Sequence, residues 1–287
     1  MDGPHGLGVT ARDFGLKGPR GWAFRDVRVD AEPGSLLAVE GPSGSGRTCL
    51  LLALTGRMKP TQGVAVVGEF KLPRQMTPLR RVSAVANVAG VTDLDPALTV
   101  GEHLEERALL QRRFDGPLCG LLRPRSERLA AARLRVDTAL SAAGLDREAL
   151  PKGSRTAVRD LERLEALRLS VALALIGRPG LLGVDDTDMK LSAAEREEVW
   201  ALLRSLTEAG TTVVAVCSEA PRDAVKVTTW AETTRIEQTD TGTASDETAH
   251  DERAAEDRRT GEARKPEDRR TEEDEETDDA LAETGRS

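Results

Sequence analysis

The chain has 287 residues, of which 41 are lysine or arginine, 49 are acidic and only 2% are aromatic, with no tyrosine. Segment 237–287 holds 19 acidic and 8 basic residues, which leaves 30 acidic and 33 basic residues for the part before it. This near-neutral part has neither the basic surface nor the aromatic platform typical of nucleic-acid-binding proteins, which argues against that class. Segment 237–287 has almost no apolar residues and cannot offset the entropy cost of folding, so we expect a disordered acidic tail. We expect the tail to aid solubility, with binding of a basic partner as the alternative.

The cysteines and the apolar stretches indicate where in the cell the protein is expected. Cys49, Cys119 and Cys217 show neither metal-ligand spacing nor the pattern of a disulfide framework, and the chain does not open with a secretory signal peptide. We therefore expect a cytoplasmic protein. The longest apolar stretch, 167–184, is interrupted by two arginines and a proline, so we expect no membrane span. Attachment to the inner face of the cell membrane would come through a partner.

The first elements in chain order are strands and one helix. Apolar and β-branched residues predict strands at 23–29 and 36–40. The run CLLLALT at 49–55 predicts a helix packed on a sheet. Two further strands are predicted at 63–68 and 82–86, where valine and alanine dominate.

A long helical stretch follows at 101–143, because apolar residues recur there at helical spacing, with interruptions near 114–117 and at Pro124. Its arginines are expected on a solvated helix face, with an anionic lipid or a partner as the alternative ligand. Strands are predicted again at 181–185 and 211–216, joined by a helix at 193–209. Two strands with a crossover helix form a βαβ unit, which predicts a parallel sheet.

The stretch GPSGSGRT, directly after the strand at 36–40, is the most informative motif. Strand, glycine-rich loop and helix follow one another as in a phosphate-binding loop. The glycines let backbone N–H groups turn inward around an anion, and the helix N-terminus adds a positive dipole end. Arginine stands where this motif has lysine. The alternative is a glycine-rich turn that binds nothing. The predicted nucleotide-binding residues are Gly41, Ser43, Gly44, Ser45, Gly46, Arg47 and Thr48.

Three ordered motifs resemble the ATP-binding cassette of ABC transporters, over about residues 9–220. GPSGSGRTCLLLALTGRMKPTQGVAVVGE resembles the Walker A loop, its helix, and the turn and strand that follow. LDPALTVGEHL, at 94–104, resembles the entry to the helical lobe. LALIGRPGLLGVDDTD, at 173–188, resembles the helix and strand of Walker B.

The resemblance implies an α/β fold, that of a P-loop NTPase of ABC type with a mostly parallel sheet flanked by helices. Residues 1–236 would form the cassette. Its core lobe would comprise about 1–93 and 165–236, and a helical subdomain would comprise about 94–164. The disordered acidic tail at 237–287 would follow.

The resemblance also implies a site that holds Mg-ATP. Thr48 and Asp185 would hold Mg²⁺, and Asp186 takes the place of the family's catalytic glutamate. Aspartate is one methylene shorter than glutamate, and a displacement of about 1 Å at such a position can cost on the order of 100-fold in rate. The alternative for Asp185 and Asp186 is a strand-end turn with a purely structural role.

Other family positions depart from the pattern. The position of the aromatic residue that stacks on adenine holds a glycine, which leaves Trp22 or Phe14 for stacking. No glutamine of the Q-loop occurs at 86–90. The signature LSGGQ aligns with LERLE at 161–165, and the switch histidine aligns with Ser218.

The resemblance implies an ATP-binding subunit that works with an integral membrane permease, as a homodimer or heterodimer of cassettes. The departures predict slow or vestigial ATP hydrolysis. The alternative is a soluble nucleotide-sensing or scaffold protein with a degenerate cassette and no role in transport. A P-loop enzyme outside this family is disfavoured by the helical insertion between Thr48 and Asp185.

Overall fold

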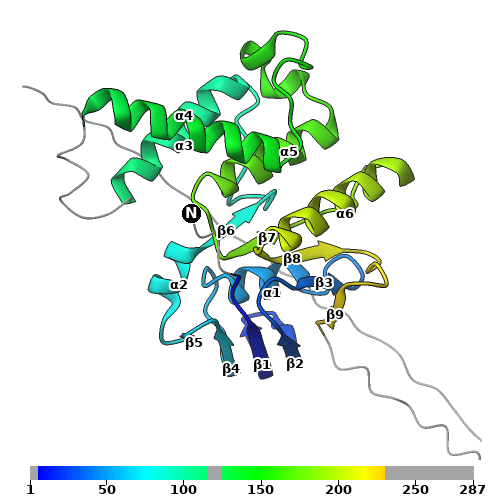
Figure 1. Cartoon of the computed structure of the whole chain (residues 1–287). Helices are drawn as coiled ribbons and strands as arrows, with labels where there is room; N and C mark the ends of the chain where they lie inside the picture. Colours follow the sequence, from blue (N-terminus) through cyan, green and yellow to red (C-terminus); the bar gives the residue numbers. More distant parts are fainter. Residues whose placement is uncertain (1–5, 115–123, 230–287) are drawn as a thin grey trace, which may run out of the picture. The chain divides into compact units, whose positions relative to one another are not determined.

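The computed structural model describes residues 6–114 and 124–229 (Figure 1). The predicted tail at 237–287 and Cys119 lie outside the described residues. The described part contains two sheets and a group of helices, and its elements place the glycine-rich loop between the two sheets.

A parallel sheet forms the centre of the described part. Its strands are β3 (Leu36–Glu40), β6 (Ser83–Ala86), β7 (Leu181–Val184), β8 (Thr212–Cys217) and β9 (Val225–Thr228), in the order β6-β7-β8-β3-β9. Every residue of β6, β7 and β8 is buried, as expected for parallel strands covered on both faces. The four predicted strands of this sheet are confirmed to within one residue, whereas β9 was not predicted.

An antiparallel sheet accompanies the parallel one. Its strands are β1 (Val9–Gly18), β2 (Gly21–Ala31), β4 (Gln62–Val67) and β5 (Phe70–Leu72), in the order β2-β1-β4-β5. The sequence predicted β2 and β4 as strands but did not separate them into a second sheet. It missed β1, where Arg12 and Asp13 interrupt the apolar pattern and the register against β2 shifts.

The helices divide into those that flank the sheets and those of the helical region. Helices α1 (Arg47–Leu54), α2 (Met76–Val82) and α6 (Ala193–Glu208) flank the sheets. The helical region holds α3 (Val100–Phe114), α4 (Arg125–Ala142), two short 3₁₀ turns η2 (Gly153–Arg155) and η3 (Val158–Asp160), and α5 (Arg163–Leu175). Helix α6 connects β7 to β8, so the predicted βαβ unit is confirmed. Ser192 begins α6 with a capping box to Glu195.

Helix α1 is buried between the two sheets. Its residues 50–54 are all buried, and Leu50 and Leu54 share one apolar core with Phe14 and Phe24 of the antiparallel sheet and Val39 of the parallel sheet. A short helix that is apolar on all sides is stable only when neighbours cover all of it. Because β3 and α1 are both buried, the glycine-rich loop that joins them is held at its start and at its end.

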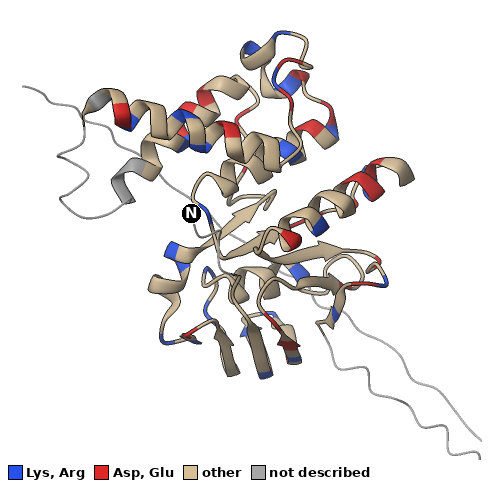
Figure 2. Ribbon diagram, viewed as in Figure 1, with Lys and Arg blue, Asp and Glu red and all other residues tan. Residues whose placement is uncertain are grey.

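The helical region carries mixed charge. Basic and acidic residues both occur on α3 and on α4 (Figure 2). Arg128 and Arg133 are exposed, as expected for a solvated helix face. Arg147 donates a hydrogen bond of 2.5 Å to Asp137 of α4. Opposite charges on the same helices weaken the case for anionic lipid as the ligand of these arginines.

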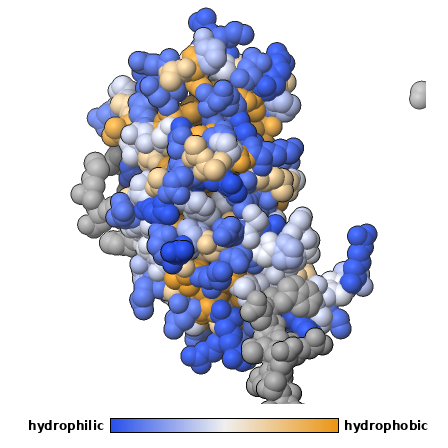
Figure 3. All heavy atoms as spheres, turned by 90° about the vertical axis from the view of Figure 1, so that its right-hand side faces the viewer, coloured by the Kyte–Doolittle hydropathy of each residue, from blue (hydrophilic) through white to orange (hydrophobic). Residues whose placement is uncertain are grey.

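Hydrophilic residues cover most of the face drawn in Figure 3, and apolar residues show between them. Over residues 6–114 and 124–229, no helix is both long enough and apolar enough to cross a bilayer.

Candidate functional site

The glycine-rich loop joins the end of β3 to the start of α1. Gly44 and Gly46 have φ angles of 81° and 84°, a region that residues with a Cβ atom rarely adopt. Gly46 is the N-cap residue of α1, and no side chain caps the helix. The first N–H groups of α1 have no acceptor within the helix, so they can serve an external anion together with the helix dipole.

Gly46 also lies against the neighbouring strand β2. A Cβ atom added at Gly46 would lie 1.9 Å from the carbonyl oxygen of Ala23, whereas one added at Gly44 would meet nothing within 4 Å. Two backbones therefore approach each other at Gly46, and the loop cannot move there independently of β2.

This difference predicts unequal costs for two similar substitutions. Gly44→Ala places alanine in the left-handed region, which costs about 1–2 kcal/mol. Gly46→Ala has the same strain and must also displace Ala23, which adds about 1–3 kcal/mol. Urea unfolding of both variants measures the gap. Equal stabilities would show that the contact with Ala23 is not a constraint on the loop.

Thr48 and Asp185 meet at the start of α1. The Thr48 hydroxyl donates a hydrogen bond of 2.8 Å to Oδ2 of Asp185, which follows β7. Asp185 is only 4% exposed. Burial raises the pKa of the Asp185 carboxyl above its ordinary value, the charge of Asp186 raises it further, and the Thr48 hydrogen bond opposes both. The sequence-predicted pair is thus brought together at the carboxyl ends of the parallel strands.

Asp186 lies next to this pair with a φ of 48°. Its backbone N–H donates to Oδ1 of Asp185 at 3.1 Å, and the residue is partly exposed. The left-handed backbone sets the direction of the Asp186 side chain at the end of β7. Asp186 is therefore the chain neighbour of Asp185 and lies at the same sheet edge as the pair of Thr48 and Asp185.

Arg47 does not lie free over the loop. Its Nη1 donates a hydrogen bond to the carbonyl oxygen of Cys217, the last residue of β8. The stem of Arg47 passes close to Gly41, since a Cβ built there would lie 3.8 Å from Cδ of Arg47. The other predicted residues of the loop are more open: Ser43 and Gly44 are exposed, and the Ser45 N–H donates to the carbonyl of Pro42 at 3.2 Å.

Asn87 belongs to the site and was missed by sequence reasoning. It follows β6 with a φ of 56°, and its amide Nδ2 donates to the carbonyl oxygen of Asp185 at 2.8 Å. Its backbone N–H donates to Ser170 Oγ at 2.7 Å. The family pattern has a glutamine in this region, and the signal in the sequence was a polar amide directly after a buried strand.

Side chains of the segment 161–165 cap the N-terminus of α5. Glu162 is the N-cap residue of α5, and Glu162 and Glu165 form a capping box, in which the Glu162 N–H donates to Glu165 Oε2 at 2.9 Å. Carboxylates therefore occupy the positive end of α5, where the family resemblance places a glycine-rich signature. An anion at this helix end would meet two negative side chains.

Of the two aromatic candidates, only Trp22 is accessible. Phe14 has no exposed surface, and its ring centroid lies 5.6 Å from that of Phe24 in the core. Trp22 is partly exposed, and Nζ of Lys17 lies 5.7 Å from its ring centroid. Trp22 immediately precedes Ala23, whose carbonyl lies against Gly46, so Trp22 is next in the chain to the strand residue that borders the loop.

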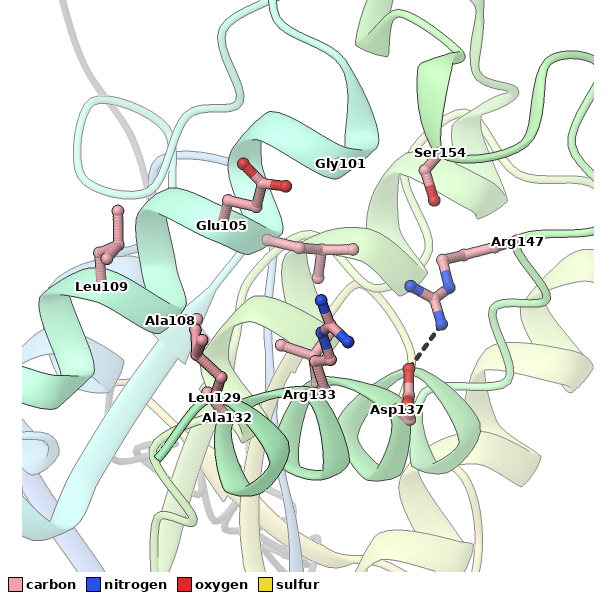
Figure 4. Close-up of a pocket in the computed structure, with 12 residues that line it drawn as sticks. Gly101, Glu105, Ala108, Leu109, Leu129, Ala132, Arg133, Asp137, Arg147 and Ser154 are labelled. Carbon is pink, nitrogen blue, oxygen red and sulfur yellow. Dashed lines mark hydrogen bonds and ion pairs between the residues drawn. The ribbon is translucent and has the colours of Figure 1, made fainter. Parts of the chain in front are cut away.

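A cavity of about 490 Å³ lies elsewhere, in the helical region (Figure 4). Leu104 and Leu109 of α3 and Leu129 of α4 supply apolar walls, and the pair of Arg147 and Asp137 lies at its border. None of the loop residues 41–48 lines it. The cavity is therefore separate from the phosphate loop.

Comparisons with known proteins give one family. The model of the family described as ABC transporter matches residues 24–188. The Nod factor export ATP-binding protein I of Cupriavidus metallidurans is 32% identical over 189 residues, which cover 66% of this chain and 55% of that protein. The phosphonates import ATP-binding protein PhnC of Thiobacillus denitrificans is 31% identical over 199 residues, 68% of this chain and 72% of that protein. A solved dimeric ATP-binding cassette in a post-hydrolysis state, bound to ADP and Pi, has a TM-score of 0.56 and 24% identity, covering 74% of this chain and 88% of that one.

The family match spans more than half of the chain and includes the glycine-rich loop and both aspartates that follow β7. The similar solved structure supports the fold. The chain spans about half the length of the first curated relative and about three quarters of the second. The fold, the loop and the match together lead to one conclusion: the chain belongs to the ABC transporter family and carries its nucleotide-binding cassette.

Proposed function

We propose that the chain is the ATP-binding subunit of an ABC transporter, with weak or vestigial ATP hydrolysis. It binds Mg-ATP through a Walker A loop in which Arg47 replaces lysine. The observation that carries the proposal is the 2.8 Å hydrogen bond from the Thr48 hydroxyl to the Asp185 carboxylate. It lies at the N-terminus of α1, which no side chain caps. A buried carboxylate is costly unless it is paired, and a bound Mg²⁺ would offset this cost.

The residues present fit a magnesium ion. A hydroxyl and a carboxylate are both hard oxygen ligands, and Asp185 is buried without a cationic side chain bonded to it in the described part. When bound, Mg²⁺ supplies charge neutralisation for the phosphates. The chain's own contribution is to hold the Thr48 and Asp185 oxygens together, and to present to phosphate the backbone N–H groups of 44 and 46–48, since the Ser45 N–H donates to Pro42.

Trp22 is the proposed stacking partner for adenine. Stacking of a base on an aromatic side chain contributes about 1–3 kcal/mol, so Trp22→Ala should weaken Mg-ATP binding by that amount while Trp22→Phe retains most of it. Calorimetric titration measures both variants. Inorganic triphosphate, which has no base, serves as the control ligand and should bind all three proteins alike. Equal ATP affinities would remove Trp22 from the site.

Slow hydrolysis follows from three separate features. Asp186, in the place of a glutamate, is too short by one methylene. The start of α5 carries the carboxylates of Glu162 and Glu165. Ser218 stands where the family has a histidine. Each feature removes one element that would act on the γ-phosphate, and such elements act as a unit.

The proposed partners are an integral membrane permease and a second cassette, identical or not, with the chain at the inner face of the cell membrane. The two curated relatives are named as ATP-binding proteins of an export and an import system. The proposed cassette spans 1–236, with the core lobe at 1–93 and 165–236 and the helical lobe at 94–164. The second candidate is a soluble nucleotide-sensing or scaffold protein, favoured by the closed start of α5.

Thermal melting with Mg-ATP tests the proposal. A ligand that binds only the folded state stabilises it by RT ln(1 + [L]/Kd), about 2.7 kcal/mol at 100 times Kd. We expect a rise in melting temperature at millimolar Mg-ATP, and no rise with Mg²⁺ alone. No rise with Mg-ATP would end the proposal. Co-purification with a membrane protein distinguishes the transporter subunit from the soluble sensor.

A further inference from the structure

Three side chains from different elements hold the segment 217–220, which begins at the last residue of β8. Arg47 donates to the Cys217 carbonyl oxygen. Asp188, after β7, accepts both the backbone N–H of Ser218, at 2.6 Å, and the Ser218 hydroxyl. Glu40, the last residue of β3, accepts the backbone N–H of Ala220 at 2.8 Å. This segment is therefore bonded to the residues on either side of the phosphate loop, Glu40 and Arg47, and to the segment that follows β7.

Glu40 is itself fixed by β9. Lys226 Nζ lies 2.8 Å from Glu40 Oε2 and donates to Oε1 at 3.1 Å. The hydrogen bond from Lys226, followed by that from the Ala220 N–H, holds the pKa of the Glu40 carboxyl below its ordinary value. Glu40 thus remains an ionised acceptor at neutral pH. It also immediately precedes Gly41, so the anchor of Ala220 and the first residue of the loop are adjacent.

The shape of the arginine side chain makes a double contact possible. A guanidinium carries five N–H donors in a rigid planar fork, whereas a lysine ammonium places its donors on one nitrogen. The contact with Cys217 occupies Nη1. Arg47 is the first residue of α1, at the helix end where phosphate would bind. The other N–H groups of the guanidinium can thus donate to a phosphate oxygen while Nη1 donates to the Cys217 carbonyl oxygen.

We propose that Arg47 couples bound phosphate to segment 217–220, and that Asp188 and Glu40 are positioning residues that keep this segment within its reach. The proposal rests on the proposed binding of Mg-ATP. Two departures from the family pattern, Arg47 and Ser218, then belong to one hydrogen-bonded unit. The arginine is a coupling device here, and not only a weaker lysine.

A double-mutant cycle on the full chain tests the coupling. Mg-ATP affinity is measured by calorimetry for the wild type, Asp188→Ala, Arg47→Lys and the double variant. Removing a carboxylate near phosphate changes affinity through charge, but arginine and lysine carry the same charge, so this effect is common to both backgrounds and cancels. We expect Asp188→Ala to weaken binding about three- to tenfold more when residue 47 is arginine than when it is lysine, a coupling typical of residues in one network.

Hydrogen exchange gives a second readout of the same unit. Mg-ATP should slow exchange of the Ser218 and Ala220 amides in the wild type and leave it unchanged in Arg47→Lys. Glu40→Gln should speed their exchange before nucleotide is added and weaken the response to it. Asp137→Ala, whose carboxylate bonds Arg147 in the helical region, is the control and should show no coupling to residue 47. Ser218→Ala replaces Asp188→Ala if the latter fails to fold.

The outcomes separate the two proposals. If Mg-ATP binds and the cycle shows coupling with protection of 217–220, the inference stands. If Mg-ATP binds but Asp188→Ala has the same effect in both backgrounds, Asp188 is merely structural, and the inference is overturned while the proposed function remains. If Mg-ATP does not bind the wild type, both are overturned.

Discussion

Replacing Asp185 with asparagine should raise the melting temperature of the nucleotide-free protein and, at the same time, remove the Mg²⁺ dependence of ATP binding. Asparagine has nearly the same shape and keeps an oxygen that accepts the Thr48 hydroxyl, although its NH₂ group cannot accept the Asp186 N–H that now bonds Oδ1. It carries no charge, so it does not incur the cost of burying a carboxylate. The two effects therefore have opposite signs, which distinguishes a functional site from a stabilising contact.

The sign of the stability change depends on pH. Burial raises the folded-state pKa of Asp185 above its unfolded value of about 3.9. Above the unfolded pKa the ionised carboxylate therefore costs stability, and this cost grows until the pH passes the raised folded pKa. Below about pH 4 the variant and the wild type should have the same melting temperature. At neutral pH the variant should have the higher melting temperature. Melting curves between pH 4 and 8 measure this gap.

The binding effect is expected to be larger. With Mg²⁺ present, Asp185→Asn should weaken ATP binding at least about tenfold, since even the loss of an outer-shell partner costs a metal site about 10–100-fold in affinity. In EDTA the variant should bind ATP at least as tightly as the wild type, because it lacks a negative charge close to the phosphates. A variant that melts below the wild type at neutral pH, or that keeps the full response to Mg²⁺, would assign Asp185 to structure alone.

The phosphate loop and its partner aspartate were predictable because both follow apolar strands. Buried parallel strands read as short runs of leucine, valine and alanine, and their carboxyl ends share one edge of the sheet. Once β3 and β7 are located, the approach of Thr48 to Asp185 follows from the sheet alone. The prediction that Thr48 and Asp185 meet therefore required no knowledge of side-chain geometry.

Other parts could not be predicted from pattern. Strand β1 carries Arg12 and Asp13 where the apolar alternation should continue, and an irregular register accommodates them. Strand β9 is short, and only Val227 in it is buried. Such strands are specified by the neighbours they pair with, and their own composition gives little signal.

The contacts of Arg47 and Asn87 depend on how far a side chain reaches in the folded protein. No sequence pattern states that an arginine in the loop will bond the last carbonyl of β8, 170 residues away. Asn87 could have been proposed from its place after a buried strand, but its contact with the Asp185 carbonyl requires the sheet order β6-β7. Phe14 is fully buried, which leaves the partly exposed Trp22 as the candidate for stacking on adenine.

Arg47→Lys should tighten Mg-ATP binding and yet leave hydrolysis slow. The ammonium is compact and can bridge the β- and γ-phosphates, and it no longer shares its donors with the Cys217 carbonyl. The affinity for Mg-ATP therefore rises, while the residues that act in the transition state of hydrolysis are unchanged. Calorimetry and a steady-state ATPase assay on the same preparation measure the two effects separately.

Only a combined variant should raise turnover. Asp186→Glu restores the missing methylene, and Ser218→His restores the side chain that the family has there, at the cost of the bond from the Ser218 hydroxyl to Asp188. Elements that act as a unit give little benefit when restored singly, so Asp186→Glu and Ser218→His alone should resemble the wild type. The triple variant with Arg47→Lys should exceed every single one, although the carboxylates at the start of α5 still limit it. If Arg47→Lys alone reached a turnover of about 1 s⁻¹, the low end of the ordinary enzyme range, the arginine would be the sole defect and the other departures would be compatible with catalysis.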